Sequence, residues 1–285
     1  MNNHKFIKDR IKIISKEKKI HFNACWKQLL LERFLSRLAH SSHVNKFIFK
    51  GGSLLSYLME IGRETTDLDF LLTRMKAEKK GLKETFEQII SVSSEDGFNF
   101  TFDSIDLLRQ PHMGYPGYRV TLKTEMGDKI QIDIGIGDAV EPLTREIRLA
   151  QCDGKPLFES AISLLVYPTE TIFSEKLETI LSKGAGNTRL KDYHDLILLL
   201  RSKEMLNLEK LKTDIANTFA HRNTIPRLIR FDETSLKRIQ QLWTAHLHGL
   251  GDTVKEFNLP NNIVTAIEEI NGYLVSIMEV SKAKS

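Results

Sequence analysis

The sequence predicts an α+β protein, in which a mixed β-sheet with flanking helices is followed by a helical C-terminal part. Alternating apolar residues at 66–72 and 129–136 are typical of strands with one buried face. Helical spacing of apolar residues separates such segments in the first half, and from Thr169 onward the pattern is helical almost throughout. We therefore expect two domains, residues 1–155 and 156–285, joined by the stretch from Pro156 to Pro168.

The expected elements of the first domain follow from these patterns. Met1 to Lys19 is lysine-rich with spaced isoleucines, which predicts an amphipathic surface helix rather than a signal or membrane segment. The others, in chain order, are a helix at 22–40, a strand at 46–50, a helix from Leu54 that Gly62 ends, a strand at 66–72, a helix at 76–92 and strands at 99–108, 118–123 and 129–136.

Composition limits the class of protein. The chain has 285 residues, with 41 basic and 37 acidic side chains, so a mild positive excess permits an anionic partner without requiring one. Cys25 and Cys152 form neither a disulfide framework nor a metal knuckle, which favours a reducing compartment. No apolar run approaches the roughly 18 residues that cross a bilayer. We expect a cytoplasmic protein without a membrane partner.

The most informative stretch is Gly51-Gly52-Ser53 followed by Asp67-Leu68-Asp69. A Gly-Gly-Ser turn that opens a helix can present backbone N–H groups and a hydroxyl to a phosphate. Because side chains alternate along a strand, the two aspartates point to the same side while Leu68 faces the core. A phosphate cradle beside two carboxylates on one face predicts a Mg²⁺ and nucleoside triphosphate site.

A third acidic candidate lies on the strand at 129–136. Its isoleucines share one face, and Asp133 lies on the opposite, open face. Asp133 is therefore a candidate carboxylate beside Asp67 and Asp69.

A second constellation lies in the helical part. Thr169 is the expected N-cap of a helix that carries Lys176, and a later helix carries Asp192 and Asp195, which share a face because they are three residues apart. Lys176 could neutralise the β- and γ-phosphates of a nucleotide. Arg189 could contact phosphate or RNA, and Asp192 could equally pair with it on the helix surface.

Together these motifs resemble the AbiEii/AbiGii toxin family, nucleotidyltransferases of the DNA polymerase β-like superfamily to which the MenT toxins are similar. The resemblance covers residues 45–200 and rests on five motifs in order. They are Gly-Gly-Ser at 51–53, Arg-x-Thr-x-Asp-Leu-Asp at 63–69, Ile-Asp-Ile-Gly at 132–135, Glu-Lys-Leu-Glu-Thr-Ile at 175–180 and Arg-x-Lys-Asp-x-x-Asp at 189–195. It implies a nucleotidyltransferase-type sheet and a helical C-terminal domain that contributes to the active-site cleft.

The resemblance also implies roles for single residues. Gly52 and Ser53 would grip the nucleotide phosphates, and Asp67 and Asp69 would bind catalytic Mg²⁺ in a two-ion site. The superfamily's third carboxylate corresponds to Asp133. Lys176 matches the family lysine that holds the triphosphate, and either Asp192 or Asp195 matches its late essential aspartate.

The activity that the resemblance implies is transfer of a nucleotide from an NTP to an RNA acceptor, the 3′ end of tRNA, by the toxin of a bacterial abortive-infection toxin–antitoxin pair. A cognate antitoxin is implied, without its mode of binding. One alternative is a nucleotidyltransferase that modifies a protein or small molecule, as AMPylating or antibiotic-modifying enzymes do. The other is a non-catalytic module. Basic residues of the helical part form either an RNA-facing patch or a solvated face, namely Arg222, Arg227, Arg230, Lys237 and Arg238.

Overall fold

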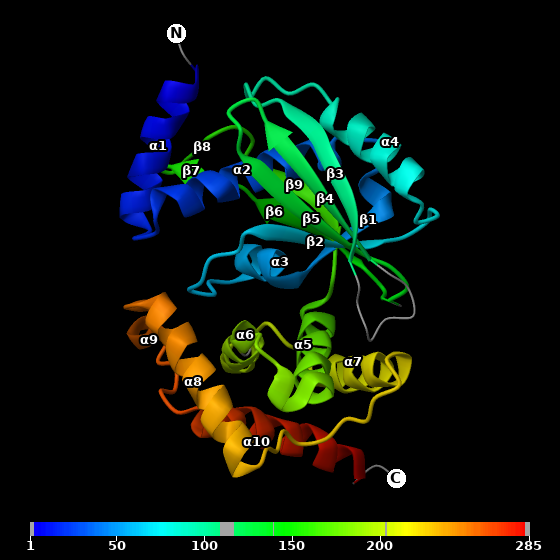
Figure 1. Cartoon of the computed structure of the whole chain (residues 1–285), viewed down its shortest axis with the longest axis vertical. Helices are drawn as coiled ribbons and strands as arrows, with labels where there is room; N and C mark the ends of the chain where they lie inside the picture. The colour runs from blue at the N-terminus through cyan, green and yellow to red at the C-terminus, as the bar shows by residue number, and fades with distance from the viewer. Residues whose placement is uncertain (1–2, 109–116, 139, 203, 283–285) are drawn as a thin grey trace. The chain divides into compact units, whose positions relative to one another are not determined.

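The computed structural model describes residues 3–108, 117–138, 140–202 and 204–282 (Figure 1). The chain divides into two compact units. Unit 1 comprises residues 1–60 and 64–167, and unit 2 comprises residues 61–63 and 168–285. The division falls at the end of the predicted junction, because residues 156–166 supply strands to unit 1.

Unit 1 is built on a mixed seven-stranded sheet of order β3-β4-β5-β2-β1-β9-β6 (Figure 1). The strands β2 and β5 are parallel, as are β1 and β9, and the other neighbours are antiparallel. The strands are β1 (Phe47–Lys50), β2 (Asp67–Leu72), β3 (Phe100–Leu108), β4 (Gly117–Thr124), β5 (Lys129–Gly135), β6 (Leu143–Arg148) and β9 (Ala161–Val166). The predicted mixed sheet is confirmed, although the sequence patterns did not reveal β6 and β9.

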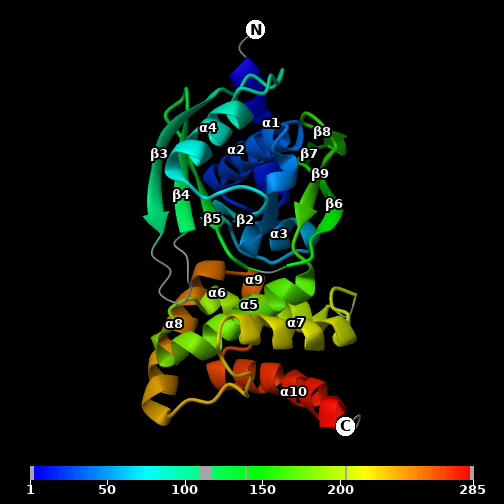
Figure 2. The same ribbon diagram turned by 90° about the vertical axis from the view of Figure 1, so that its right-hand side faces the viewer.

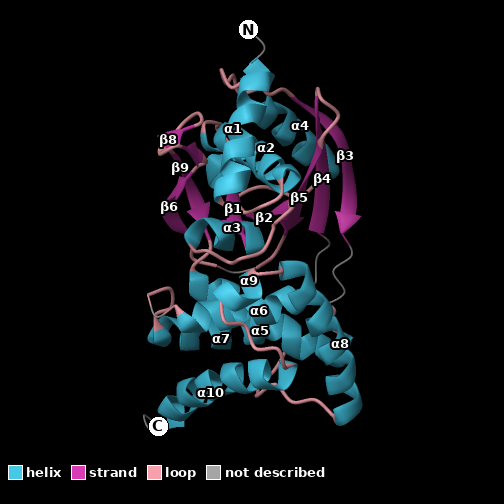
Figure 3. Ribbon diagram, turned by 90° about the vertical axis from the view of Figure 1, so that its left-hand side faces the viewer, coloured by secondary structure: helices cyan, strands magenta, loops and turns pink. Residues whose placement is uncertain are grey.

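Helices cover the apolar face of this sheet. Phe34 of α2 stacks on Phe86 of α4, and Phe86 meets Phe47 of β1 edge-on, with ring centroids 5.8 and 5.7 Å apart. Figures 2 and 3 show α2 and α4 against the same side of the strands. The remaining elements of unit 1 are α1 (Asn3–Glu17), α2 (Phe22–Ala39), a 3₁₀ turn (Val44–Lys46), α3 (Gly51–Leu58), α4 (Lys79–Ile90) and the hairpin β7 (Gln151–Cys152) and β8 (Lys155–Pro156).

The alternation predicted for two strands is what positions the candidate site. Leu68 and Phe70 of β2, and Ile132 of β5, are buried toward the helices. The residues between them, Asp67 and Asp133 among others, consequently occupy the opposite face.

Unit 2 is helical, as the sequence predicts. Helix α5 packs against α6 and α7, and α10 packs against α6 and α8. The predicted N-cap, Thr169, instead lies inside the helix and donates its hydroxyl to the carbonyl of Met205, while Pro168 occupies the cap position. The helices are α5 (Thr169–Lys183), a 3₁₀ turn (Gly184–Gly186), α6 (Leu190–Arg201), α7 (Leu208–His221), α8 (Glu233–Leu250), α9 (Thr253–Glu256) and α10 (Ile263–Lys282).

In the part of the chain that the structure describes, every helix is too short or too polar to cross a lipid bilayer.

Candidate active site

The glycine turn lies directly against the second aspartate. Strand β1 ends at Lys50, and Gly51 starts α3 with a φ of +74°, which favours glycine. A β-carbon at position 51 would lie 2.2 Å from Asp69 Oδ2 and 2.8 Å from Asp69 Cβ. The absence of a side chain at Gly51 therefore allows the first turn of α3 to approach the Asp69 carboxylate.

Ser53 connects the same turn to the first aspartate. Its hydroxyl donates a hydrogen bond to the backbone carbonyl of Asp67, and the side chain is 2% exposed. This bond fixes the start of α3 to the start of β2. The hydroxyl proton that we expected to meet a phosphate is used inside the protein. The amide N–H groups of the first turn are therefore the candidate phosphate donors.

The carboxylates share a row of charged side chains across four strands. Lys50 of β1 is the register partner of Asp69, Asp69 is the partner of Asp133 on β5, and Asp133 is the partner of Arg119 on β4. Directly paired residues point to the same face. The sheet therefore brings Asp69 and Asp133 together as the sequence predicts, with a cation at each end of the row.

Arg119 binds the predicted third carboxylate. Its Nε and one terminal nitrogen donate to the two oxygens of Asp133, each at 2.7 Å. These hydrogen bonds raise the pKa of Arg119, and the charges of Asp133, Asp67 and Asp69 add to the effect. Arg119 thus acts as the counterion of the carboxylate face.

Asp67 and Asp69 carry the chemistry that a divalent ion requires. Carboxylate oxygens are the ligands Mg²⁺ prefers, and the turn at Gly51 leaves the Asp69 carboxylate beside the backbone rather than behind a side chain. Within the described residues, no set of three His, Cys, Asp or Glu side chains is arranged to hold a metal ion. These two aspartates fit a metal that arrives with a nucleotide, whereas Asp133 stays a predicted ligand.

Sequence reasoning missed Lys50 and Arg119 as members of this site. Lys50 Nζ donates to Asp138 at 3.0 Å and to the Tyr167 hydroxyl at 3.2 Å, next to the turn. A signal for Arg119 exists in the sequence. If the strands at 118–123 and 129–136 form a hairpin that pairs Lys123 with Lys129, counting back places Arg119 opposite Asp133.

Unit 2 contains the second predicted constellation as a buried ion cluster. Lys176 Nζ lies 2.9 Å from Asp192 Oδ1 and 2.7 Å from Asp195 Oδ2. Arg63 donates twice to Asp195 at 2.7 Å, and Arg189 lies 3.3 Å from Asp192. The structure therefore brings together Lys176, Asp192, Asp195 and Arg189, and adds Arg63.

Burial and charge oppose each other in this cluster. Burial raises the pKa of Asp195, but the charges and hydrogen bonds of Lys176 and Arg63 outweigh it and lower that pKa well below its usual range. Burial likewise lowers the pKa of Lys176, and the carboxylates of Asp192 and Asp195 reverse this, so its pKa is raised. Asp195 and Lys176 are therefore both charged at neutral pH.

Only one cation of the cluster is widely exposed. The side chain of Lys176 is 9% exposed and that of Arg63 is 6% exposed, whereas the side chain of Arg189 is 49% exposed. An anionic ligand would therefore meet Arg189 first, while Lys176 holds the two aspartates.

A histidine pair adjoins the cluster. His194 Nδ1 lies 3.1 Å from His246 Nε2. Among the residues that the structure describes, His194 Nε2 has no hydrogen-bond partner although it is buried. Burial lowers the pKa of His194 to about 4, so the ring is neutral at pH 7.

Comparison with known proteins decides the family. The sequence matches the family described as "Nucleotidyl transferase AbiEii toxin, Type IV TA system" over residues 33–268. The chain belongs to the AbiEii family. Nucleotidyl transfer is the activity of this family, and its toxin–antitoxin description implies an antitoxin partner.

No curated protein matches the sequence. Solved structures similar to the chain include JHP933 from Helicobacter pylori, with 16% identity and a TM-score of 0.47 over 92% of this chain and 97% of that one. A structure described as a putative nucleotidyltransferase from H. pylori has 16% identity and a TM-score of 0.43, and the match covers 81% of this chain and 97% of that one. MenT4, a nucleotidyltransferase toxin from Mycobacterium tuberculosis, has 16% identity and a TM-score of 0.49, and the match covers 89% of this chain and 94% of that one.

Proposed function

We propose that this AbiEii protein transfers a nucleotide from an NTP to the 3′ end of an RNA, with tRNA as the acceptor, in a reaction that requires Mg²⁺. The observation that supports this most strongly is the contact between the Gly51 turn and the Asp69 carboxylate, with Asp67 on the same strand face. This arrangement places helix amide donors for phosphate beside oxygen ligands for a cation.

In the reaction, an acceptor hydroxyl oxygen bonds to the α-phosphorus of the NTP, the bond from that phosphorus to the β-phosphate oxygen breaks, and diphosphate leaves with the proton lost from the hydroxyl. Two Mg²⁺ ions held by Asp67 and Asp69 would activate the hydroxyl and stabilise the leaving group. The amides of Gly52 and Ser53 bind phosphate oxygens. Arg119 holds the Asp133 carboxylate in place on the same face.

We assign different roles to the cations of unit 2. Arg189 contacts an anionic group because its side chain is the exposed member of the cluster. Lys176 is a positioning residue, since it is buried between Asp192 and Asp195 and reaches Arg189 only through Asp192.

The test of the function is labelling. Purified protein is incubated with each α-labelled NTP, Mg²⁺ and total cellular RNA, and the products are separated on a gel. A labelled band of tRNA size with wild-type protein, absent with Asp67→Asn or with EDTA, is the expected result. Asp103→Asn serves as the matched control, because Asp103 is an aspartate of the same sheet paired with Lys129 at 3.0 Å. Label in protein or in a small molecule instead of RNA would show the alternative acceptor.

A further inference from the structure

Helix α1 carries a row of exposed lysines, with Asp9 among them. Its lysines at positions 5, 8, 12 and 16 are three or four residues apart, so they lie on one side of the helix, and all four are exposed. At 1.5 Å per residue they extend over about 16 Å. We call this set, Lys5, Lys8, Lys12 and Lys16, the lysine stripe.

The opposite face of α1 is already occupied. Ile7, Ile11 and Ile14 are 4%, 1% and 4% exposed, because the helix packs on α2 and on strand β7. An amphipathic helix that binds a lipid surface inserts its apolar face into the membrane. Ile7, Ile11 and Ile14 are buried in the protein here, although Phe6 and Ile13 stay exposed at 57% and 40%. The lysines are therefore the charged surface that α1 offers to a partner, and a polyanion is the partner they fit.

The lysine stripe continues toward the candidate site within unit 1. Lys8 Nζ lies 5.5 Å from the centre of the Trp26 ring on α2, and Trp26 Nε1 donates to Asp128 at 3.1 Å. The next residue, Lys27, donates to the carbonyl of Lys129 at the start of β5. Two residues further along β5, Gln131 is the register partner of Asp67.

Electrostatics agree with this path. Burial lowers the pKa of Lys27, and the nearby carboxylates of Asp128 and Asp67 act in the opposite direction. Lys27 is thus a cation close enough to Asp67 to interact with its charge, which fits an acceptor whose backbone is anionic and whose end must reach that aspartate.

We propose that the lysine stripe binds the sugar–phosphate backbone of the RNA acceptor, and that Lys27 extends this surface toward Asp67. The inference rests on the proposed function, because it assigns the acceptor a docking surface. One stripe lysine, Lys12, pairs with Asp9 at 2.9 Å, as Arg222 of unit 2 pairs with Glu178 and Lys237 with Glu233, each at 2.8 Å. The inference favours α1 because it sets four exposed lysines along one helix face.

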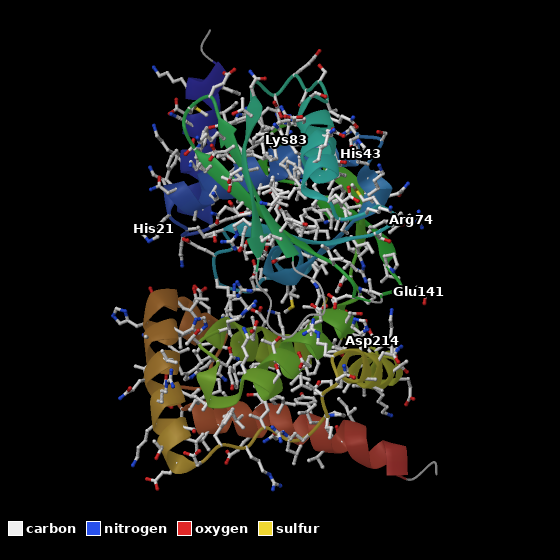
Figure 4. The ribbon with its side chains drawn as sticks, turned by 45° about the vertical axis from the view of Figure 1, so that its right-hand side comes forward. His21, His43, Arg74, Lys83, Glu141 and Asp214 are labelled. Carbon is white, nitrogen blue, oxygen red and sulfur yellow. The ribbon has the colours of Figure 1, made fainter. Side chains whose placement is uncertain are left out.

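The test compares two charge-matched variants of the full chain. One changes the four lysines of the stripe to Gln. The control changes four other exposed lysines to Gln, around α4, namely Lys76, Lys79, Lys80 and Lys83. Each variant removes four positive charges from a formal net charge of +4, which gives zero in both cases. The two sets lie on different parts of unit 1. In Figure 4 the label of Lys83 marks the control set, and the label of His21, four residues after the end of α1, marks the neighbourhood of the stripe.

Binding of fluorescently labelled bulk tRNA is measured by anisotropy over a range of salt concentrations. The stripe variant should lose affinity, and its plot of log K against log salt should be shallower by about three units, because each phosphate contact contributes roughly 0.7 to 0.9. The control should keep the wild-type slope. Equal slopes in the two variants would overturn the inference, as would stripe-dependent binding to vesicles of phosphatidylserine and phosphatidylcholine without any effect on RNA.

Failure of the inference can be separated from failure of the function. If wild-type protein labels RNA and the stripe variant labels it with an unchanged KM for RNA, the docking surface is wrong and the function stands. If wild-type protein binds RNA through the stripe but labels none, the function is wrong and the surface stands. The expected result is an at least tenfold higher KM for RNA with little change in kcat. Circular dichroism should show both variants folded, since Gln is nearly as good a helix former as Lys.

Discussion

Substitution Gly51→Ala tests the contact on which the site is built. Gly51 has a φ of +74°, and the new β-carbon would lie 2.2 Å from Asp69 Oδ2 and 2.7 Å from Asp69 Cγ. Atoms do not approach that closely, so the Asp69 carboxylate must turn away or the start of α3 must move. Either change separates the phosphate donors from the carboxylate.

Two effects of this substitution have different magnitudes. An alanine in the left-handed region costs about 1 to 2 kcal/mol of stability. Displacement of a reacting group by about 1 Å can cost roughly 10²-fold in rate. We therefore expect Gly51→Ala to lose modest stability and at least 10²-fold in kcat for nucleotide transfer.

The matched control is Gly154→Ala. Gly154 has a φ of +70° in the β7–β8 hairpin, and a β-carbon there would have no atom within 4 Å. It shares the backbone strain of Gly51→Ala without the clash. Gly154→Ala should lose about 1 to 2 kcal/mol of unfolding free energy in urea and Gly51→Ala at least as much, whereas only Gly51→Ala should lose transfer and Mn²⁺ binding. If the two variants transfer nucleotide at rates within about twofold of each other, the contact between Gly51 and Asp69 has no role in the reaction.

Three further predictions concern the ion pairs and the histidine pair. Lys176→Met leaves the carboxylates of Asp192 and Asp195 buried without their shared cation, and it should reduce the free energy of unfolding in urea by about 3 kcal/mol. Lys183→Met is the control, and an equal loss of unfolding free energy in both variants would contradict the prediction. Burial lowers the pKa of His194 from 6.5 to about 4, so the unfolded state takes up a proton first, and stability should fall by about 3 kcal/mol as pH decreases from about 6.5 to 4. His194→Phe should flatten this part of the pH profile, and an unchanged profile would show that His194 is not the group responsible. Arg119→Met should tighten Mn²⁺ binding in the absence of nucleotide on the order of tenfold, about 1.4 kcal/mol, because it removes a cation from the carboxylate face; weaker binding by calorimetry would argue against this role.

The strand patterns predicted the position of the carboxylates well. One buried face on each of β2 and β5 is enough to place Asp67, Asp69 and Asp133 on the other face, because the alternation has a period of two. The register that sets Asp69 beside Asp133 comes from a parallel pairing between strands far apart in the sequence. A single sequence does not contain that information.

Side-chain partners were less predictable than element positions. Ser53 could donate to a phosphate or to a backbone carbonyl, and only the close approach of α3 to β2 selects Asp67. Lys176 has the pattern of an exposed helix lysine, yet two aspartates of α6 neutralise it in the interior. Strand β6 was missed because, apart from Ile147, its side chains are largely exposed and give no apolar alternation.

An anomalous-difference map from crystals of the full chain, grown with Mn²⁺ and a non-hydrolysable NTP analogue, would locate the metal and the nucleotide together. We expect manganese peaks bound by Asp67 and Asp69, with the analogue's phosphates against the first turn of α3. Nucleotide bound elsewhere, or manganese on other carboxylates such as Asp103 while Asp67 and Asp69 have none, would contradict this expectation.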